Sequence, residues 1–505
     1  MTVVETDSGA SAGAPWTTRM SARLGPRRFS LLVFAGCFGV LFAWWLAFFP
    51  VLVTPDSFTY VYEATTNHWM TDHSVVYDAL IWLSLQSTHG VATLTFLQIV
   101  AFAAVIAYIA NGLRLIGTPP VATGIVPVVA LLAPSLGAFP VYLWKDVPFT
   151  LTALWLLGLL IRLVPVAETG PDWSSSPPAR RLVRWIFVAT LLMCLFRNNA
   201  FVFAFLAAVV LLILWRRASL RLVGAMVAAI VAAIVLTAFV FPALGVQRAK
   251  SDLLLGTAYD DIAYIYQHDP HALSAADQSL LRQVAPLSHW RKSGGCYTSD
   301  DLTNSPDFSR DAASANSGKL FALWRRLSVD HPVALFRVRM CRGFIAWSPV
   351  PGPKGIGGTV FPLTHEPERR FQEIPNPTFR NALRPAPVTG DRDFAQSYLH
   401  NSFNAEWALW RGATWAYVLY LAIAVAVWRT RRWSLVALAA LPLGVQIGVI
   451  LDNPNQLVRY MMLPLYAGVI LLPLVALRRR APAAELQATD EPPPTQPTAD
   501  EPVTE

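Results

Sequence analysis

Ten apolar runs, separated by polar stretches, constrain this chain more than any other feature. Several of them approach or exceed the roughly 20 residues that a helix needs to cross a bilayer. Only 14% of the 505 residues are charged, against about 25% in a typical soluble protein. The sequence therefore predicts an all-α polytopic membrane protein with about ten transmembrane helices. The apolar runs are 29–53, 91–111, 119–142, 147–163, a short run that ends at residue 196, 200–215, 222–241, 412–428, 434–451 and 460–477.

The basic residues predict how the chain is threaded. With ten spans, five Arg-containing clusters all fall on one side, as the positive-inside rule requires of a cytoplasmic face. Both termini are then cytoplasmic, in a multi-pass protein of the plasma (inner) membrane. The net charge of +8 does not indicate a nucleic-acid partner, because the basic residues lie between the apolar runs. The clusters are at 23–28, 180–184, 216–221, 429–432 and 478–480.

The same pattern divides the chain into five parts. A transmembrane module at 29–245 contains a first external loop at 54–88, in which two surface helices are expected. The polar stretch 246–407 has no run long enough to span, so it is predicted to be a large extracytoplasmic region before the last three spans. A C-terminal transmembrane module follows at 408–480. The ends, 1–28 and 481–505, are rich in small, polar and Pro residues and are predicted to be disordered and cytoplasmic.

Unusual polar residues gather at the outer ends of the predicted spans. Charged groups at a membrane boundary are costly unless they are solvated, paired or used. With the threading above, these residues come from four separate segments but share one face. They are Asp56, Asp72 and His73 in the first loop, Lys145 and Asp146 in YLWKDVPF, Arg197, Asn198 and Asn199 in LFRNNA, and Arg459 and Tyr460 in LDNPNQLVRY.

These residue types fit transfer of a group from a lipid-linked phosphate. Lys145, Arg197 and Arg459 could hold the phosphate, since Arg presents a planar fork to its oxygens. A carboxylate beside them could take a proton from an acceptor hydroxyl, and Asp56 is the first choice for this general base. Asp72 and His73 are further catalytic candidates, and Asp146, Asn198, Asn199 and Tyr460 would support the site.

Each residue also has a purely structural reading. Asp56 lies in a PDS helix start and could simply cap the following helix. Asp72 and His73 could be a solvated turn, Lys145 and Asp146 a local charge pair, and Arg197 and Arg459 interface anchors. No metal or other cofactor is predicted, because His68, Asp72 and His73 have no further ligand spacing around them. Cys296 and Cys341 lie on the predicted oxidising side, so a disulfide between them is plausible.

The layout of residues 29–480 resembles the C-type glycosyltransferase superfamily, polytopic enzymes that use polyprenyl-phosphate-linked sugars. The resemblance rests on the acidic first external loop, the large later external region and the outer Arg459–Tyr460 stretch. It is similar to an uncharacterised bacterial branch with PDS, DH, KDV[PL]F and R[NH]N stretches. Ser74 follows Asp72 and His73 where relatives often have Pro, and no paired-acid motif is present.

The resemblance implies a hexosyl- or pentosyltransferase whose base is a first-loop carboxylate, Asp56 or else Asp72. Its donor would be a polyprenyl-phosphate sugar, with membrane lipid around the donor tail. The acceptor would be a glycan, lipid or protein of the cell envelope, reached on the extracytoplasmic face. Two rival classes remain open from the residues alone, a transporter or flippase of lipid-linked sugars and a non-catalytic envelope-assembly protein. A transporter would place charged residues near the middle of the spans, where this chain has few.

Overall fold

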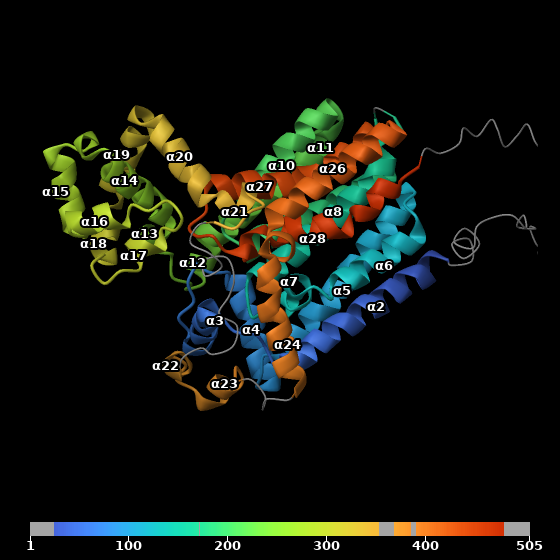
Figure 1. Cartoon of the computed structure of the whole chain (residues 1–505), viewed down its shortest axis with the longest axis horizontal. Coiled ribbons are helices and arrows are strands. Elements are labelled where there is room, and N and C mark those ends of the chain that lie inside the picture. The colour runs from blue at the N-terminus through green and yellow to red at the C-terminus, as the bar shows by residue number, and fades with distance from the viewer. Residues whose placement is uncertain (1–24, 171, 353–367, 385–389, 479–505) are drawn as a thin grey trace, which may run out of the picture.

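The computed structural model describes residues 25–170, 172–352, 368–384 and 390–478. Most of residues 1–28 and the tail 481–505, both predicted to be disordered, lie outside the described residues. The described chain forms helices joined by turns, with two isolated backbone bridges, Leu52 to Tyr142 and Met70 to Gln247. Figure 1 shows a bundle of long helices with a smaller helical lobe beside one end of it.

The bundle is built from the apolar runs of both predicted transmembrane modules. Its helices pack against neighbours in the chain, α2 with α5, α5 with α8 and α8 with α9, and the two modules meet where α10 packs against α27. They are α2 (Pro26–Ala47), α5 (Ala92–Ile116), α6 (Pro120–Ala130), α7 (Pro134–Gly137), α8 (Asp146–Ala167), α9 (Pro177–Phe196), α10 (Ala200–Trp215), α11 (Leu220–Val235), α12 (Phe241–Ala243), α26 (Gly412–Thr430), α27 (Ala440–Leu451) and α28 (Met462–Ile470).

Seven helical segments of the described chain are long and apolar enough to cross a membrane. The bent pair Pro120–Ala130 and Pro134–Val141 makes an eighth if it counts as one span. Two of the predicted runs fall in the single segment Ala200–Ala243, which turns at Arg216, where φ is 49°, so that α10 packs against α11. The predicted short span is α9, which carries three Arg in its first eight residues. The chain is thus a helical protein with several candidate spans, and the count of ten stays a prediction.

Two short helices follow α2 in the first predicted external loop. They are α3 (Pro55–Thr66) and α4 (Val75–Thr88), and they pack against each other. Thr54 and Ser57 form a reciprocal capping box at the start of α3, and Pro55 occupies its first position. Such a cap satisfies amide groups that a helix start leaves without partners. Asp56 and Glu63 are therefore presented from a fixed helix.

The predicted extracytoplasmic region divides into two parts. The first is a lobe with its own apolar core, which includes Tyr259, Trp290, Phe308 and Leu320. The lobe helices are α13 (Ser251–Leu254), α14 (Gly256–His268), α15 (Ala275–Val284), α16 (Leu287–Ser293), α17 (Asp300–Thr303), α18 (Arg310–Ala315) and α19 (Ser317–Asp330). Two further helices, α20 (Pro332–Arg342) and α21 (Phe344–Trp347), lead back to the bundle and contact α27.

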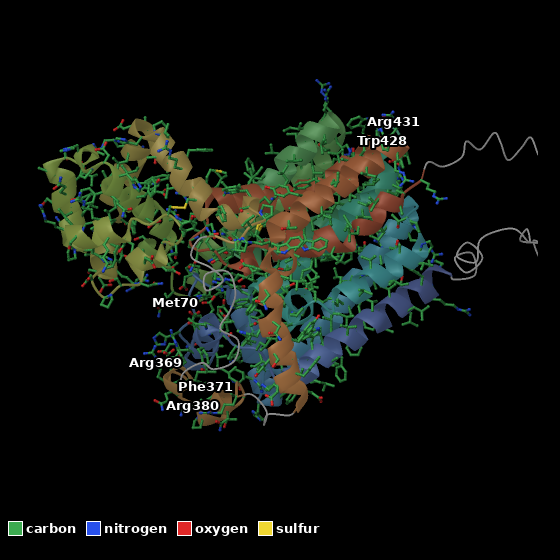
Figure 2. The ribbon with its side chains drawn as sticks, viewed as in Figure 1. Met70, Arg369, Phe371, Arg380, Trp428 and Arg431 are labelled. Atoms are coloured by element: carbon green, nitrogen blue, oxygen red, sulfur yellow. A yellow bond between two sulfur atoms is a disulfide. The ribbon has the colours of Figure 1, made fainter. Side chains whose placement is uncertain are left out.

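The second part lies on the other side of the first loop. Here α22 contacts α3, and α24 contacts α2 and α7. In Figure 2, Arg369, Phe371 and Arg380 of this part lie at one end of the molecule, while Trp428 and Arg431 lie at the opposite end of the bundle. The helices are α22 (Glu368–Gln372), α23 (Pro377–Asn381), α24 (Gly390–Asn401) and α25 (Glu406–Leu409).

The Arg431 end of the bundle is held by ionic contacts between distant segments. Arg432 pairs with Glu168, 2.8 Å from Nε to the carboxylate, and donates to the carbonyl of Ile116. The loops after α5, α8 and α26 therefore meet at this end. The lobe and the first loop lie at the other end (Figure 1).

Candidate functional site

A polar cavity of about 480 Å³ lies where the first loop, the bundle and the lobe meet. Its walls are formed by segments that are hundreds of residues apart in the chain. All ten polar residues that the sequence singled out line it: Asp56, Asp72, His73, Lys145, Asp146, Arg197, Asn198, Asn199, Arg459 and Tyr460. Their roles are not given by this placement, but their predicted convergence is a feature of the fold.

Asp56 is positioned by the start of α3. Ser57, next to it, donates from its hydroxyl to the carbonyl of Leu143, at 2.8 Å. Just before α3, the backbone of Leu52 pairs with the 141–143 segment, accepting from the amide of Leu143 at 3.0 Å. The first loop and the segment that leads to Lys145 therefore run side by side, which places both side chains in one cavity.

The Asp72–His73 turn is fixed against the end of α9. The amide of Asn198 donates to the carbonyls of Thr71 and Asp72, at 2.8 and 3.0 Å. Ser74 accepts from the amide of Tyr77 as the N-cap of α4 and donates to the carbonyl of Leu195. Ser and Asn side chains commonly satisfy backbone groups in this way. Asn198 thus has a positioning role, holding the turn that carries Asp72 and His73.

Two ion pairs cross the cavity wall. Arg459, just before α28, pairs with Asp56 and lies 4.9 Å from the ring of Trp144. Arg197 donates to Asp146 at 2.7 Å and stacks 4.4 Å from the ring of Tyr460. Asp146 links the two pairs, since its second oxygen lies 3.8 Å from Arg459. Both guanidinium groups are therefore held in place by carboxylates and aromatic rings together.

The carboxylate of Asp56 is ionised over almost the whole pH range. Burial alone would raise its pKa, but the charge and hydrogen bond of Arg459 outweigh burial and lower the pKa of Asp56 to about 2. The side chain is 32% exposed, against 2% for Asp146. Asp56 is thus the more accessible of these two carboxylates.

Lys145 is the cavity's least compensated cation. Burial lowers the pKa of Lys145, and the charges of Asp146 and Asp56 oppose this only in part. Its ammonium donates to the backbone carbonyl of Asp72 at 3.4 Å. Among the described residues, no carboxylate lies within ion-pair distance of it. A buried ammonium without a paired carboxylate is well suited to meet an incoming anion.

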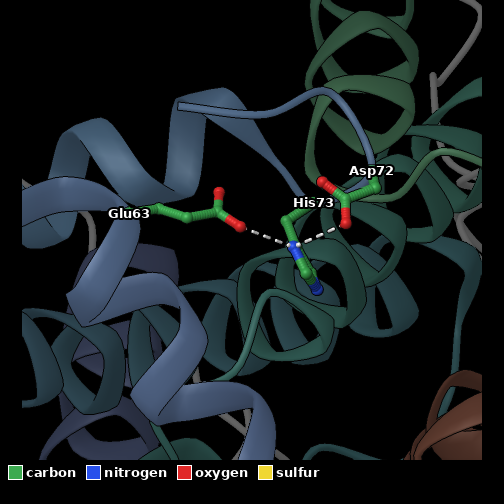
Figure 3. A group of neighbouring side chains, drawn as sticks. All are labelled: Glu63, Asp72 and His73. Atoms are coloured by element: carbon green, nitrogen blue, oxygen red, sulfur yellow. Dashed lines mark hydrogen bonds and ion pairs between the residues drawn. The ribbon is translucent and has the colours of Figure 1, made fainter. Parts of the chain in front are cut away.

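His73 lies between two carboxylates, Glu63 and Asp72, as Figure 3 shows. Its Nδ1 is 3.1 Å from Glu63 and 3.4 Å from Asp72. Burial and the charge of Lys145 lower the pKa of His73, but the hydrogen bonds with the two acids prevail and raise it to about 9. Glu63 was not among the predicted site residues, because no local pattern places it beside a His ten residues further on.

The lobe supplies a wall that sequence reasoning missed. Asp300 accepts from the amide of Asn455 at 2.7 Å, and Thr257 donates to Asp452 at 3.0 Å. The amide and hydroxyl of Ser299 both donate to the carbonyl of Pro454. These contacts dock the lobe on the loop before the last predicted span. Within 246–407 no apolar period or motif marks these positions, so only docking of the lobe reveals them. The lobe residues that line the cavity are Leu254, Gly256, Thr257, Ser299, Asp300, Thr303, Asn304 and Arg310.

Fold and cavity together define a helical protein with several candidate membrane spans and a charged cavity at one end of its bundle. The chain belongs to the family of unknown function DUF6020, whose model matches residues 53–305. The match begins just before α3 and includes the first loop, Lys145, Arg197 and most of the lobe, but not Arg459. Searches of curated proteins and of solved structures found no match.

Proposed function

We propose that this protein is an integral membrane glycosyltransferase. It moves a sugar from a polyprenyl-phosphate donor to an acceptor of the cell envelope, a glycan, lipid or protein, on the extracytoplasmic face. The observation that carries the proposal is one cavity in which an accessible carboxylate, Asp56, stands among the cations Lys145, Arg197 and Arg459. The resemblance of the chain's layout to C-type glycosyltransferases supports the choice of donor.

The donor phosphate would meet Lys145 first. This ammonium is the cavity cation without a carboxylate within ion-pair distance among the described residues, so binding it breaks no ion pair. Arg459 adds a guanidinium that is already oriented by Asp56 and Trp144. As the bond between the sugar's C1 and the phosphate oxygen breaks, negative charge grows on the leaving phosphate. Fixed cations stabilise such charge without having to reorganise.

Asp56 would take the proton of the acceptor hydroxyl while that oxygen forms its bond to C1. With a pKa of about 2, Asp56 is ionised but a weak base as long as Arg459 holds it. A donor phosphate that shares Arg459 would weaken this hold and raise the pKa of Asp56. Donor binding would thus prepare the base. The products are the glycosylated acceptor and polyprenyl phosphate, and the proton ends on Asp56.

Two features support the side of the membrane that we propose for the cavity. The Cys296–Cys341 disulfide, with Cα atoms 5.6 Å apart, belongs to the part of the chain next to the cavity, and disulfides persist in oxidising compartments. Arg431 and Arg432 lie at the opposite end of the bundle, where the positive-inside rule favours the cytoplasm. We therefore propose that the cavity faces outside the cytoplasm, in a multi-pass protein of the plasma membrane with both termini inside.

The test is turnover by Asp56→Asn in the full-length chain, purified in detergent. A panel of polyprenyl-phosphate hexoses and pentoses is offered with envelope extract as acceptor, and release of polyprenyl phosphate is measured. Loss of the base should lower turnover by about 10²–10⁴-fold, while binding of polyprenyl phosphate persists.

The control is Glu373→Gln, which changes an exposed carboxylate paired with Arg370 and far along the chain from the cavity residues. It should turn over like the wild type. If Asp56→Asn keeps full turnover, Asp56 is not the base. If the wild type releases no polyprenyl phosphate from any donor yet moves lipid-linked sugars across vesicles, the protein is a transporter and the enzyme proposal is wrong.

A further inference from the structure

Glu63, Asp72 and His73 form a compact group at the edge of the cavity (Figure 3). One ligand atom from each lies within 4.8 Å of the others. In Figure 3 the Nδ1 of His73 faces both carboxylates, and its second ring nitrogen points away from them. The three groups come from two pieces of chain, α3 and the turn before α4, so their meeting is a product of the fold.

Two of the three separations between these atoms match those of ligands around a metal ion. Two ligand atoms that are each about 2.1 Å from an ion lie about 3.0 Å apart at octahedral angles and about 3.4 Å apart at tetrahedral angles. The Nδ1 of His73 is 3.1 Å from Glu63 and 3.4 Å from Asp72. The oxygens of Glu63 and Asp72 lie within 4.8 Å of each other, so an ion could contact all three atoms once the side chains adjust around it.

Buried carboxylate oxygens that lack a hydrogen-bond donor also favour a bound cation at this place. The Glu63 side chain is only 4% exposed, and its second oxygen accepts no hydrogen bond from the residues that the structure describes. Asp78, one turn into α4, is fully buried, and neither of its oxygens has a described donor. Buried carboxylates of this kind are costly unless a cation compensates them. A divalent cation held by Glu63 and Asp72 would supply positive charge beside these carboxylates.

We propose that Glu63, Asp72 and His73 bind one divalent cation. An imidazole with two carboxylates favours Mn²⁺ or Zn²⁺ over Mg²⁺ and Ca²⁺, which prefer oxygen ligands alone. Three protein ligands leave positions open on the ion, and Asp72 and His73 face the cavity. The ion ties α3 to the turn before α4 and adds positive charge beside Lys145. The proposal is independent of the glycosyltransferase assignment, because it concerns binding without any donor or acceptor.

The experiment measures Mn²⁺ and Zn²⁺ binding to the full-length chain in detergent, after removal of bound metal with a chelator. Free Mn²⁺ is followed by electron paramagnetic resonance, and Zn²⁺ and Mg²⁺ are then added as competitors. We expect one Mn²⁺ per chain, displaced by Zn²⁺ at lower concentration than by Mg²⁺. Glu63→Gln and His73→Gln should weaken binding by about tenfold or more, as loss of groups at metal sites commonly does.

Glu373→Gln is the matched control for loss of one carboxylate and should bind like the wild type. Asp72→Asn provides a third ligand variant, and the Asp72 side chain is more exposed than that of Glu63, so the folding of this variant is less at risk. The proposal is overturned if the wild type binds neither ion, or if the folded ligand variants bind as tightly as Glu373→Gln. In that case His73 simply forms ion pairs with the two carboxylates.

Discussion

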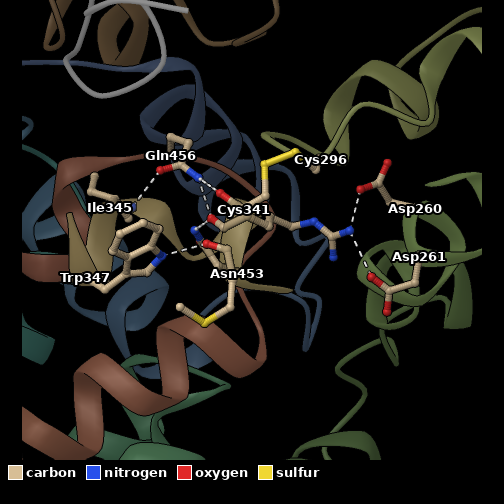
Figure 4. Close-up of a disulfide and its surroundings, with 10 residues drawn as sticks. Asp260, Asp261, Cys296, Cys341, Ile345, Trp347, Asn453 and Gln456 are labelled. Atoms are coloured by element: carbon tan, nitrogen blue, oxygen red, sulfur yellow. Dashed lines mark hydrogen bonds and ion pairs between the residues drawn. A yellow bond between two sulfur atoms is a disulfide. The ribbon is translucent and has the colours of Figure 1, made fainter. Parts of the chain in front are cut away.

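The cavity and the junction between lobe and bundle both contain buried Asp–Arg clusters, but they differ in how fully the charges are paired. At the junction, Arg342 contacts Asp260 and Asp261 and also donates to the carbonyl of Thr257. Trp324 donates to Asp261 as well. Arg342 is 1% exposed and both acids are 0% exposed. The Cys296–Cys341 disulfide lies next to this cluster, as Figure 4 shows.

In the cavity the same residue types are arranged around open space. The Asp56 side chain is 32% exposed, and Lys145 has no carboxylate within ion-pair distance among the described residues. A cluster of Asp and Arg therefore does not identify a ligand-binding site by itself. A closed cluster in which every charge has an ionic partner stabilises the fold, whereas accessible or unpaired charges around a cavity are available to a ligand.

The largest expected effect is a loss of stability when the Arg342 cluster at the junction is broken. Arg342→Met keeps much of the side-chain volume but leaves Asp260 without its ionic partner and Asp261 with Arg339 as its remaining one. Removing one member of a buried pair costs about 3–5 kcal/mol. Hydrogen–deuterium exchange of the α14 amides should therefore accelerate strongly. Arg337→Met on the same helix α20 changes an exposed Arg and should shift exchange by less than about 0.5 kcal/mol. Equal exchange in the two variants would remove the structural role assigned to the junction.

A smaller effect is expected from Lys145→Gln, and it should be on binding. A charged hydrogen bond contributes about 1.5–3 kcal/mol, so affinity for polyprenyl phosphate should fall about 10- to 100-fold. Thermal stability should stay the same or rise, because a poorly compensated buried cation is removed. Fluorescence titration with synthetic polyprenyl phosphate measures the affinity. Lys292→Gln, an exposed Lys on α16, is the control. Unchanged affinity together with lowered stability would make Lys145 a structural residue like Arg342.

The sequence predicts the parts of this molecule that depend on local pattern. Apolar runs predicted the long helices of the bundle, and the PDS start predicted α3, because hydropathy and capping act over a few neighbouring residues. The cap itself is formed by Thr54 and Ser57 and not by Asp56. Predicted spans that end on the same side of a membrane should end at a similar depth. Lys145 and Arg197 are selected on this basis from separate segments, and both line the same cavity.

What the sequence could not predict depends on contacts over long distances. The pair of Asp56 with Arg459 joins residues 403 positions apart, and nothing near either residue selects the other. Glu63 meets His73 only because the turn after α3 folds back. Asp300 reaches the cavity only because the lobe docks through Ser299 and Pro454. The residues of the site could thus be found in part, while their pairing required the tertiary structure.

The smallest expected effect is the pH dependence of stability that comes from Asp56. Its pKa is lowered to about 2 in the folded chain, against about 3.9 in an unfolded one. A lowered pKa stabilises the fold above the unfolded value, and this stabilisation is lost as the pH falls from about 4 through 2. Because the side chain is 32% exposed, solvent screening keeps the contribution to about 1 kcal/mol or less.

Thermal unfolding of the wild type and of Asp56→Asn, followed from pH 6 down to pH 2, measures this contribution. The wild type should lose more stability below pH 4 than the variant, since the amide that replaces the carboxyl group does not titrate. Saturating polyprenyl phosphate should shrink the difference, because a phosphate that shares Arg459 weakens the pair and moves the pKa of Asp56 upward. A difference that is unaffected by the lipid would mean that the phosphate does not reach Arg459. The Asp56–Arg459 pair would then be structural, like the pairs of Arg342.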